Sequence, residues 1–287
     1  MNAASRPSVL PIGPGDVDAV ADFLHTQLNP RVPREAWRGL LRPPWGQRGP
    51  NSGFQLVSTE GVVGAYAAVY AVRGEAGRET RICNLAAFCV LEPHRAHAVR
   101  LLRALVGQEG FAFTDLSPSG NVPRLNEMLG FEYLDTRTRL TANVPRPARG
   151  RELITDLAEI DSLLSAGDRG IFRDHRDAAA CHHLVVSDGG RHAYLVYRHD
   201  RRRGVRAFAT PLYVGADRGL LDDAWGVVAT YLLRRGLVAT LAEPRILGFT
   251  PPGPARDLGT ARPRMFRGAP GGVDRDYLYS ELALVPW

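Results

Sequence analysis

The alternation of apolar and polar positions in the first half of the chain predicts a mixed sheet with helices. Residues 8–28 have the pattern of a short strand, a Gly/Pro turn and an amphipathic helix. Two apolar strands within 53–73 are joined at Thr59, Glu60 and Gly61, which predicts a hairpin. The following segments predict a strand at 82–91, a helix at 95–106, a strand at 111–116, a helix opened by 119–121 and a last strand within 131–140. We expect helices on both faces of this sheet.

The second half of the chain repeats this order of elements. The segment "LVVSDGGRHAY" (184–194) aligns without gaps on "LVSTEGVVGAY" (56–66). After it, "VRAFATPLYVGA", "DDAWGVVATYLLRRG", "LVATLAEPRIL" and "DYLYSELALVPW" predict a strand, a helix, a strand and a terminal strand. This agreement indicates an internal duplication.

The stretch between the two halves, "NVPRPARGR" at 143–151, has two prolines and no apolar periodicity, so we expect a linker there. The expected domains are therefore 1–142 and 152–287. The expected fold class is α/β with mixed α+β character: two tandem domains, each a mixed, mostly antiparallel sheet flanked by helices.

Composition narrows the class of protein. With 45% apolar and 23% charged residues among 287, the chain has the composition of a globular protein that is large enough for two domains. No apolar run is long enough to span a bilayer and no leader segment is recognisable, so we expect a cytoplasmic protein without a membrane partner. The three cysteines form no CxxC pair, which indicates neither a metal site nor a disulfide framework.

The formal charge of +6 comes from arginine alone, because the chain contains no lysine. One cluster, "YRHDRRRGVR" at 197–206, lacks the interleaved aromatic residues or the recognition helix that nucleic-acid binding favours. We therefore expect no nucleic-acid partner and interpret the cluster as a solvated hairpin tip. Docking of an acidic carrier protein is the alternative.

The segment "CVLEPHRAHAVR" (89–100) has the features of an anion site. An apolar strand ends at Pro93, and a helix without acidic residues in its first turns follows. A helix start carries unpaired amides and the positive end of the helix dipole. We expect the amides of Ala96, His97, Ala98, Val99 and Arg100, with the charges of Arg95 and Arg100, to hold a pyrophosphate.

This segment resembles the donor-binding motif of the GNAT superfamily of acyltransferases, Arg/Gln-x-x-Gly-x-Gly/Ala, which wraps the pyrophosphate of an acyl-CoA. The downstream "SPSGNVPRLNEMLGF" resembles the superfamily's next motif, in which an asparagine precedes a helix that closes on Gly130 and Phe131. The likeness spans 8–140. It implies acyl-CoA or acetyl-CoA as co-substrate, with an acyl carrier protein as a possible donor, and no metal.

The chain departs from the family pattern at three positions. Ala98 and Arg100 replace the two small residues of the loop, and the added methyl group of Ala98 narrows the approach to the phosphates. Asn126 stands where the family often has a tyrosine that protonates the departing thiolate, and an amide does not supply that proton.

The resemblance also implies where the reaction takes place. The thioester would lie where the fourth and fifth strands splay apart, against the amides of Phe88, Cys89 and Val90. Asn121 and Asn126 match the donor-side motif after the fifth strand.

Three polar residues near this splay are catalytic candidates. Asp115 would accept the proton of an attacking amine, Ser117 would relay a proton to the thiolate, and Asn84 would face the acceptor. In the alternative interpretation, Asp115 caps a turn and Asn84 is a polar residue of a half-buried strand.

The second half shows no comparable motif, and Asp217, Asp222 and Asp223 near its helix start would repel a phosphate. We therefore expect a GNAT-type N-acyltransferase in which only the first domain binds the donor, with a small molecule or a peptide as the amine acceptor. The alternatives are a non-catalytic GNAT-fold scaffold, or an O-acyltransferase that acts on a glycan or a natural product.

Overall fold

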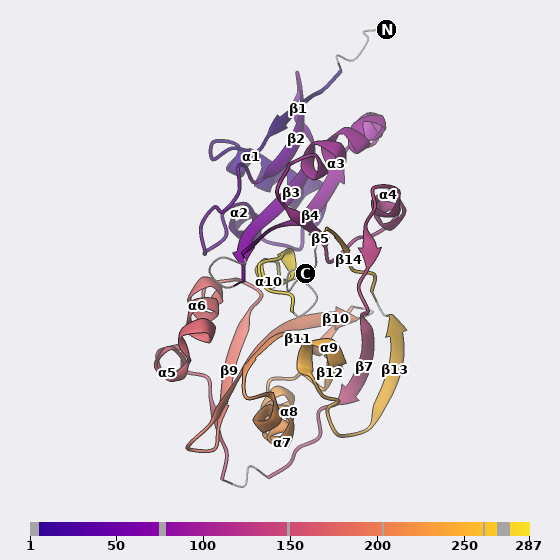
Figure 1. The fold of residues 1–287 in the computed structure, drawn as a ribbon. Coiled ribbons are helices and arrows are strands. Elements are labelled where there is room, and N and C mark those ends of the chain that lie inside the picture. The colour runs from indigo at the N-terminus through magenta and orange to yellow at the C-terminus, as the bar shows by residue number, and fades with distance from the viewer. Residues whose placement is uncertain (1–5, 75–78, 148–149, 203, 261, 269–275) are drawn as a thin grey trace. The chain divides into compact units, whose positions relative to one another are not determined.

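The computed structural model describes residues 6–74, 79–147, 150–202, 204–260, 262–268 and 276–287. The chain divides into two compact units, each built around its own seven-stranded sheet (Figure 1). The first unit comprises Met1–Tyr133, Arg264–Val273 and Tyr279–Val285. The second comprises Leu134–Pro263, Asp274–Leu278 and Pro286–Trp287.

The first unit follows the element order expected from the sequence. Its elements are β1 (Ser8–Pro11), α1 (Val17–Gln27), α2 (Arg34–Leu41), β2 (Gly53–Ser58), β3 (Gly61–Arg73), β4 (Thr80–Val90), the 3₁₀ helix η1 (Glu92–His97), α3 (Ala98–Val106), β5 (Ala112–Asp115), α4 (Val122–Met128), β6 (Glu132–Tyr133), β14 (Met265–Arg267) and α10 (Glu281–Leu284). The strand order is β1-β2-β3-β4-β5-β14-β6. Only β4 and β5 pair in parallel among the described strands of this sheet, so the expected mixed, mostly antiparallel sheet is confirmed.

The two faces of this sheet are covered by different helices, α1 and α2 on one side and α3 on the other (Figure 1). Tyr66, Ala68 and Tyr70 of β3 pack in one apolar cluster with Leu101 and Leu105 of α3. The intervening residues of β3 are buried as well, as expected for a strand with both faces covered.

The second unit has the same strand plan. Its elements are β7 (Arg137–Ala142), β8 (Glu152–Ile154), α5 (Leu157–Leu163), α6 (Ala166–His175), β9 (His182–Ser187), β10 (His192–Arg202), β11 (Val205–Ala216), α7 (Arg218–Asp223), α8 (Trp225–Arg234), β12 (Ala239–Ala242), α9 (Pro244–Leu247) and β13 (Ala255–Thr260). The strand order, read from the other edge, is β8-β9-β10-β11-β12-β7-β13. The single parallel pair among these strands joins β11 and β12, the counterparts of β4 and β5.

The two halves of the chain exchange one strand. β7, expected as the last strand of the first domain, fills the sixth place of the second sheet, and β14 fills the sixth place of the first sheet. The expected boundary at residue 142 therefore differs from the observed units, because Leu134–Ala142 belongs to the second unit. The apolar pattern of a strand specifies its buried face but not which of two similar sheets it joins.

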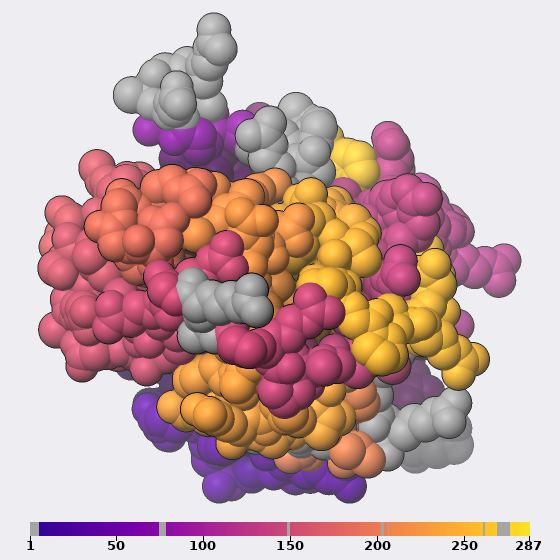
Figure 2. Space-filling model, turned by 90° about the horizontal axis from the view of Figure 1, so that it is seen from below, coloured from indigo at the N-terminus to yellow at the C-terminus, as the bar shows by residue number. Residues whose placement is uncertain are grey.

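The segment 143–151 was expected to be a linker, and its described residues, 143–147 and 150–151, contact the second unit. The backbone amide of Arg146 donates to Thr230 Oγ1 at 3.0 Å, and Arg151 Nη1 donates to the carbonyl of Asp223 at 2.6 Å. In Figure 2 the magenta part of this segment lies at the surface beside orange residues. Arg146 is thus bound to α8 and Arg151 to α7.

The C-terminal segment "DYLYSELALVPW" does not form the expected strand, so this prediction is wrong. Residues Glu281–Leu284 form the short helix α10, and Ser280 Oγ accepts a hydrogen bond from the amide of Leu282 at 3.2 Å. A serine that caps a helix favours a helical turn over an extended conformation. The apolar residues around Ser280 have the composition of a strand, so the sequence pattern favours a strand instead.

Candidate active site

The splay between β4 and β5 is where the first unit gathers its buried polar residues. The parallel pairing runs from Ile82–Ala112 to Leu85–Asp115 and ends there. Immediately beyond this pairing, β4 carries a bulge: Ala68 lies opposite Leu85 and Tyr66 opposite Phe88, so β4 has one residue more than β3. A bulge bends its strand and increases the local twist, which directs Phe88–Val90 away from the line of β5.

Asp115, the last residue of β5, is 3% exposed. Its Oδ2 accepts a hydrogen bond from Asn126 Nδ2 at 2.8 Å and a longer one from the hydroxyl of Tyr66 at 3.4 Å. Asn126 is itself buried, and its Oδ1 has no hydrogen-bond partner among the described residues. These three side chains come from β5, α4 and β3, so the local fold of the first unit fixes their geometry.

The protonation of Asp115 is set mainly by burial. Burial raises the pKa of Asp115 from its ordinary 3.8 to about 7, and the nearby Glu281 carboxylate adds to the rise. Hydrogen bonds from Asn126, the Ser117 backbone and Tyr66 act in the opposite direction. Asp115 therefore exchanges a proton near neutral pH, which suits general acid–base chemistry.

Ser117 lies just after β5, and its side chain is exposed to solvent. Its hydroxyl donates to Oε1 of Glu281 at 2.6 Å, within the same unit. Glu281 is completely buried, so a carboxylate that no local sequence pattern indicates lies next to two of the expected catalytic residues. The residues are 164 positions apart, and no local pattern pointed to this contact.

Asn84 is 1% exposed, and both ends of its amide are engaged inside the unit. Its Nδ2 donates to Thr114 Oγ1 at 3.0 Å, and its Oδ1 accepts from the backbone amide of Glu281 at 3.2 Å. Asn84 thus ties β4 to β5 and to α10. These contacts correspond to a positioning role rather than to direct contact with an acceptor.

The expected donor segment differs from a bare helix start. Glu92–His97 forms a 3₁₀ helix ahead of α3, and the amide of Ala98 donates to the carbonyl of Arg95. The expectation that all amides from Ala96 to Arg100 are free is therefore wrong at Ala98. Pro93 fixes its own φ near −65°, a helical value, so the chain begins to wind before Arg95.

The two expected phosphate ligands have partners within the unit. Arg95 pairs with Glu92 at 2.8 Å, and both side chains are more than two-thirds exposed. Arg100 Nη1 donates to the carbonyl of Pro7 at 2.7 Å. The surface pair of Arg95 costs little to break, about 0–1 kcal/mol, whereas Arg100 is tied to the chain before β1.

The remaining residues expected to bind the donor fall into exposed and partly buried groups. Ala96, Val99 and Asn121 are exposed, and His97 and Ala98 are half-buried. On β4, Phe88, Cys89 and Val90 are half-buried, and the Phe88 ring lies 4.5 Å from the ring of Tyr66, centroid to centroid. Phe88 thereby connects the splay with the Asp115 cluster.

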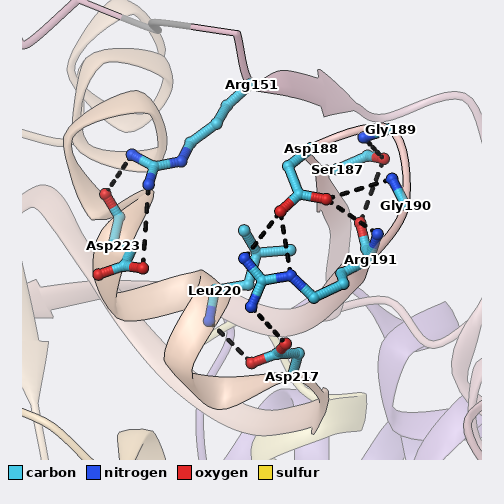
Figure 3. A network of polar contacts seen from close by, with 9 residues as sticks. All are labelled: Arg151, Ser187, Asp188, Gly189, Gly190, Arg191, Asp217, Leu220 and Asp223. Carbon is cyan, nitrogen blue, oxygen red and sulfur yellow. Dashed lines mark hydrogen bonds and ion pairs between the residues drawn. The ribbon is translucent and has the colours of Figure 1, made fainter.

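The helix start in the second unit that corresponds to the donor segment is occupied by its own chain. Asp217 is the N-cap of α7 and accepts a hydrogen bond from the amide of Leu220 at 2.9 Å. Its other oxygen pairs with Arg191 Nη1 at 3.1 Å, and Arg191 also binds Asp188 in the β9–β10 turn (Figure 3). A carboxylate therefore lies where a phosphate would have to bind.

Three further features of the described part of the chain bear on partners. It contains no group of three His, Cys, Asp or Glu residues that could hold a metal ion. No helix in it is long and apolar enough to cross a membrane. In the basic cluster at 197–206, Asp200 is buried and pairs with Arg262 at 3.2 Å, while Arg203 lies outside the described residues.

Comparison with known proteins identifies the fold. No protein-family model matches the sequence, and no curated protein matches it. Among solved structures, the chain is similar to a GCN5-related N-acetyltransferase from Anabaena variabilis, with a TM-score of 0.58 and 12% identity over 91% of this chain and 72% of that one. It is equally similar to one from Kribbella flavida, with a TM-score of 0.58 and 14% identity over 94% and 73%. An N-myristoyltransferase from Saccharomyces cerevisiae matches with a TM-score of 0.52 and 10% identity over 99% and 86%.

These likenesses show the fold alone, because all identities are low. They confirm the GNAT-type fold expected from the sequence, and the two similar sheets agree with a tandem arrangement.

Proposed function

We propose that the first unit transfers an acyl group from an acyl-CoA thioester to an amine. The observation that carries this proposal is the buried Asp115, with a pKa raised to about 7 by burial, at the point where β4 and β5 separate. A carboxyl group with a pKa near 7 can both accept and release a proton at neutral pH, and acyl transfer to an amine requires such a proton acceptor.

In the proposed reaction the thioester carbonyl lies against the backbone of Phe88–Val90, whose amides would polarise it. The amine nitrogen attacks the carbonyl carbon, and the carbon–sulfur bond breaks. Asp115, which is buried, accepts through water the proton that the nitrogen loses, and the exposed hydroxyl of Ser117 relays a proton from solvent to the departing thiolate. Asn84 holds Thr114 and the Glu281 backbone in place.

The donor would approach along η1 and the start of α3. Arg95 is exposed there. To bind a phosphate it would only have to break its surface ion pair with Glu92. Ala96, Val99 and Asn121 are exposed and therefore accessible to the same ligand. Acetyl-CoA or a longer acyl-CoA is the proposed co-substrate, and a carrier-protein thioester is the alternative donor.

The acceptor that we propose is a small molecule or a peptide with a primary amine, in the cytoplasm. An O-acyltransferase that acts on a glycan or a natural product would use the same site with a hydroxyl group as the nucleophile. A hydroxyl group remains protonated near pH 7, so it depends on the base more strongly than a neutral amine does.

One observation favours a second candidate, a non-catalytic scaffold with this fold. The Ala98 amide and the Arg100 guanidinium, two expected phosphate ligands, bind the protein's own carbonyl groups. If those contacts persist in solution, the donor loses part of its site, and the buried carboxyl groups would be remnants of a lost activity.

The experiment that separates the candidates measures thiol release from acetyl-, octanoyl- and palmitoyl-CoA with a panel of primary amines. An acyltransferase predicts release that requires an amine and that falls by about 10²–10⁴-fold in Asp115→Asn. Asp257→Asn, an exposed carboxylate of the second unit, serves as the matched control. Release that is unaffected by Asp115→Asn, or no release with any donor, favours the scaffold.

A further inference from the structure

The two central strands of the second unit separate as those of the first unit do. The parallel pairing of β11 with β12 ends at Ala209 and Thr240. Just beyond it β11 carries a bulge at Leu212, where it has one residue more than β10. In the first unit the bulge of β4 follows the parallel pairing with β5 in the same way. The second unit therefore has a splay of its own, at the place that corresponds to the candidate active site.

The C-terminal segment Asp276–Leu278, which belongs to the second unit, spans this splay. The backbone amide of Tyr277 donates to the carbonyl of Leu212 at 2.9 Å, and the Tyr277 hydroxyl donates to Oε2 of Glu243. Leu212 is the bulge residue of β11, and Glu243 directly follows β12. One residue thus binds both walls of the splay, the first with its backbone and the second with its side chain.

Further contacts within the unit hold Tyr277 in this position. Tyr277 is completely buried, and Glu243 is 4% exposed. The Arg245 guanidinium lies 4.5 Å from the centre of the Tyr277 ring, and Arg245 Nε lies 3.3 Å from Oε2 of Glu243. The amide of Leu278 donates to Asp276 Oδ1 at 2.9 Å, which fixes a local turn around Tyr277. The helix α9 lies against β11 (Figure 1), so the unit's own residues close the splay.

The bulge explains why a polar partner is needed at this place. An extra residue in one strand disrupts the ladder of hydrogen bonds and leaves backbone groups without a partner in the neighbouring strand. Leu212 is completely buried, and a buried carbonyl is costly unless it accepts a hydrogen bond. The Tyr277 amide supplies this bond. The pantetheine arm of an acyl-CoA is an extended chain with secondary amides, so it offers the same kind of donor.

We propose that Asp276–Leu278 fills, in the second unit, the place that the pantetheine arm of the donor takes in the first unit. The splay of the second unit is a groove for an extended amide chain, and its ligand is a segment of the same protein. The parallel with the donor rests on the proposed acyl transfer, whereas the contacts of Tyr277 do not depend on it.

The proposal implies one donor site per chain. At the start of α7 the Asp217 carboxylate occupies the place of a phosphate, and Tyr277 occupies the place of the pantetheine arm. Both parts of a donor site in the second unit are thus taken by the chain itself. Asp217 repels only the phosphates, so pantetheine without the pyrophosphate would fit the splay once the Tyr277 side chain is removed.

The test compares hydrogen exchange of β11, β12 and α9 in the full-length wild type, Tyr277→Phe and Tyr277→Ala. Tyr277→Phe loses only the bond to Glu243, so exchange of β12 and α9 should become about 10-fold faster. Tyr277→Ala also loses the buried ring, so exchange of β11 and β12 should become at least about 10²-fold faster. Millimolar pantetheine should slow this exchange in Tyr277→Ala and leave the wild type unchanged.

Two controls accompany this comparison. Tyr231→Phe removes a hydroxyl from α8, where the Tyr231 ring lies against Arg235, and it should leave the exchange of β12 and α9 unchanged. The thiol 2-mercaptoethanol has no amides, so it should give Tyr277→Ala no protection.

Several results would overturn the proposal. One is exchange of β11 and β12 that is the same in Tyr277→Ala as in the wild type. Another is faster exchange that pantetheine does not slow, or that 2-mercaptoethanol slows equally. A calorimetric stoichiometry of two CoA per wild-type chain would also contradict it. If Tyr277→Ala does not fold, Tyr277→Phe and this stoichiometry decide.

Failure of this inference is distinguishable from failure of the proposed function. A wild type that releases thiol, with equal exchange of β11 and β12 in all three proteins, keeps the acyl transfer and removes the role of Tyr277. A wild type that releases no thiol from any donor removes the proposed function. The exchange rates and the effect of pantetheine then still decide whether Tyr277 fills a groove for an amide chain.

Discussion

Replacing Asp115 with asparagine should stabilise the first unit at alkaline pH while it removes the proposed activity. The asparagine keeps the shape of the side chain but carries no charge, so the cost of burying an ionised carboxylate disappears. If Asp115 merely capped a turn, asparagine, which caps about as well as aspartate, would leave the stability nearly unchanged at every pH.

The magnitude follows from the two pKa values. Burial raises the pKa of Asp115 from 3.8 to about 7, so the folded state binds this proton more tightly than the unfolded chain does. The resulting stabilisation is fully present below about pH 4 and is lost as pH rises through about 7. About three pH units at about 1.4 kcal/mol each give an upper limit of about 4 kcal/mol for the difference.

The assay is native-state hydrogen exchange of peptides from β3 and β4, because these strands report the stability of the first unit. Wild type and Asp115→Asn are compared at pH 4 and at pH 8, and the change between the two pH values is the quantity of interest. We expect Asp115→Asn to gain stability relative to wild type between pH 4 and pH 8, by up to about 4 kcal/mol. This difference is independent of any hydrogen bond that the substitution changes equally at both pH values.

Asp200→Asn provides a control of opposite sign in the second unit. Burial acts to raise the pKa of Asp200, but the charges of Arg262 and Arg198 outweigh it and the pKa is lowered. Its stabilising effect is present above the unfolded value and is lost as pH falls, so Asp200→Asn should cost more at pH 8 than at low pH. A relative stability of Asp115→Asn that does not change between pH 4 and pH 8 would refute the reasoning about Asp115.

Three other outcomes are expected. Asp217→Ala removes the N-cap of α7 and its bond to Arg191, so thermal unfolding should show a loss of about 1 kcal/mol, with the response to CoA unchanged. Gly53→Ala should cost more than about 1 kcal/mol, since φ is +111° there and the new Cβ would lie 2.2 Å from the backbone oxygen of Tyr66. Gly61→Ala, at φ +106° with open space around it, should cost less than Gly53→Ala when the two variants are compared by urea titration.

The sequence predicted the local elements and their repetition because both depend on patterns within short segments. The hairpin turn at 59–60 falls between β2 and β3, and the corresponding turn of the second half falls between β9 and β10, as the gap-free alignment indicated. The two seven-stranded sheets also agree in the order of their strands, so the repetition extends over the whole of each sheet.

The exchange of β7 and β14 could not be predicted in the same way. Both strands have an ordinary pattern, and either sheet offers an equivalent sixth place. Which sheet β7 joins depends on the path of the chain between Tyr133 and Arg137, and the pattern of apolar residues does not predict that path.

The candidate site was predicted only in part, for a related reason. Asp115 and Ser117 adjoin a strand end, so a short polar run revealed them. Glu281 lies in an apolar segment that was interpreted as a strand, and only the fold brings it to Ser117. The sequence does not distinguish the 3₁₀ helix before α3, because a proline such as Pro93 can either end a strand or begin a helical turn.

The central claim, that the first unit binds an acyl thioester, is tested most directly by calorimetric titration of CoA, acetyl-CoA and palmitoyl-CoA. The account predicts binding by the wild type, equal or tighter binding by Ala98→Gly, and none by Ala98→Glu, whose carboxylate would face the phosphates. Arg95→Gln should weaken binding, whereas Arg191→Gln in the second unit should not. A wild type that gives no heat with any of the three ligands would contradict the account.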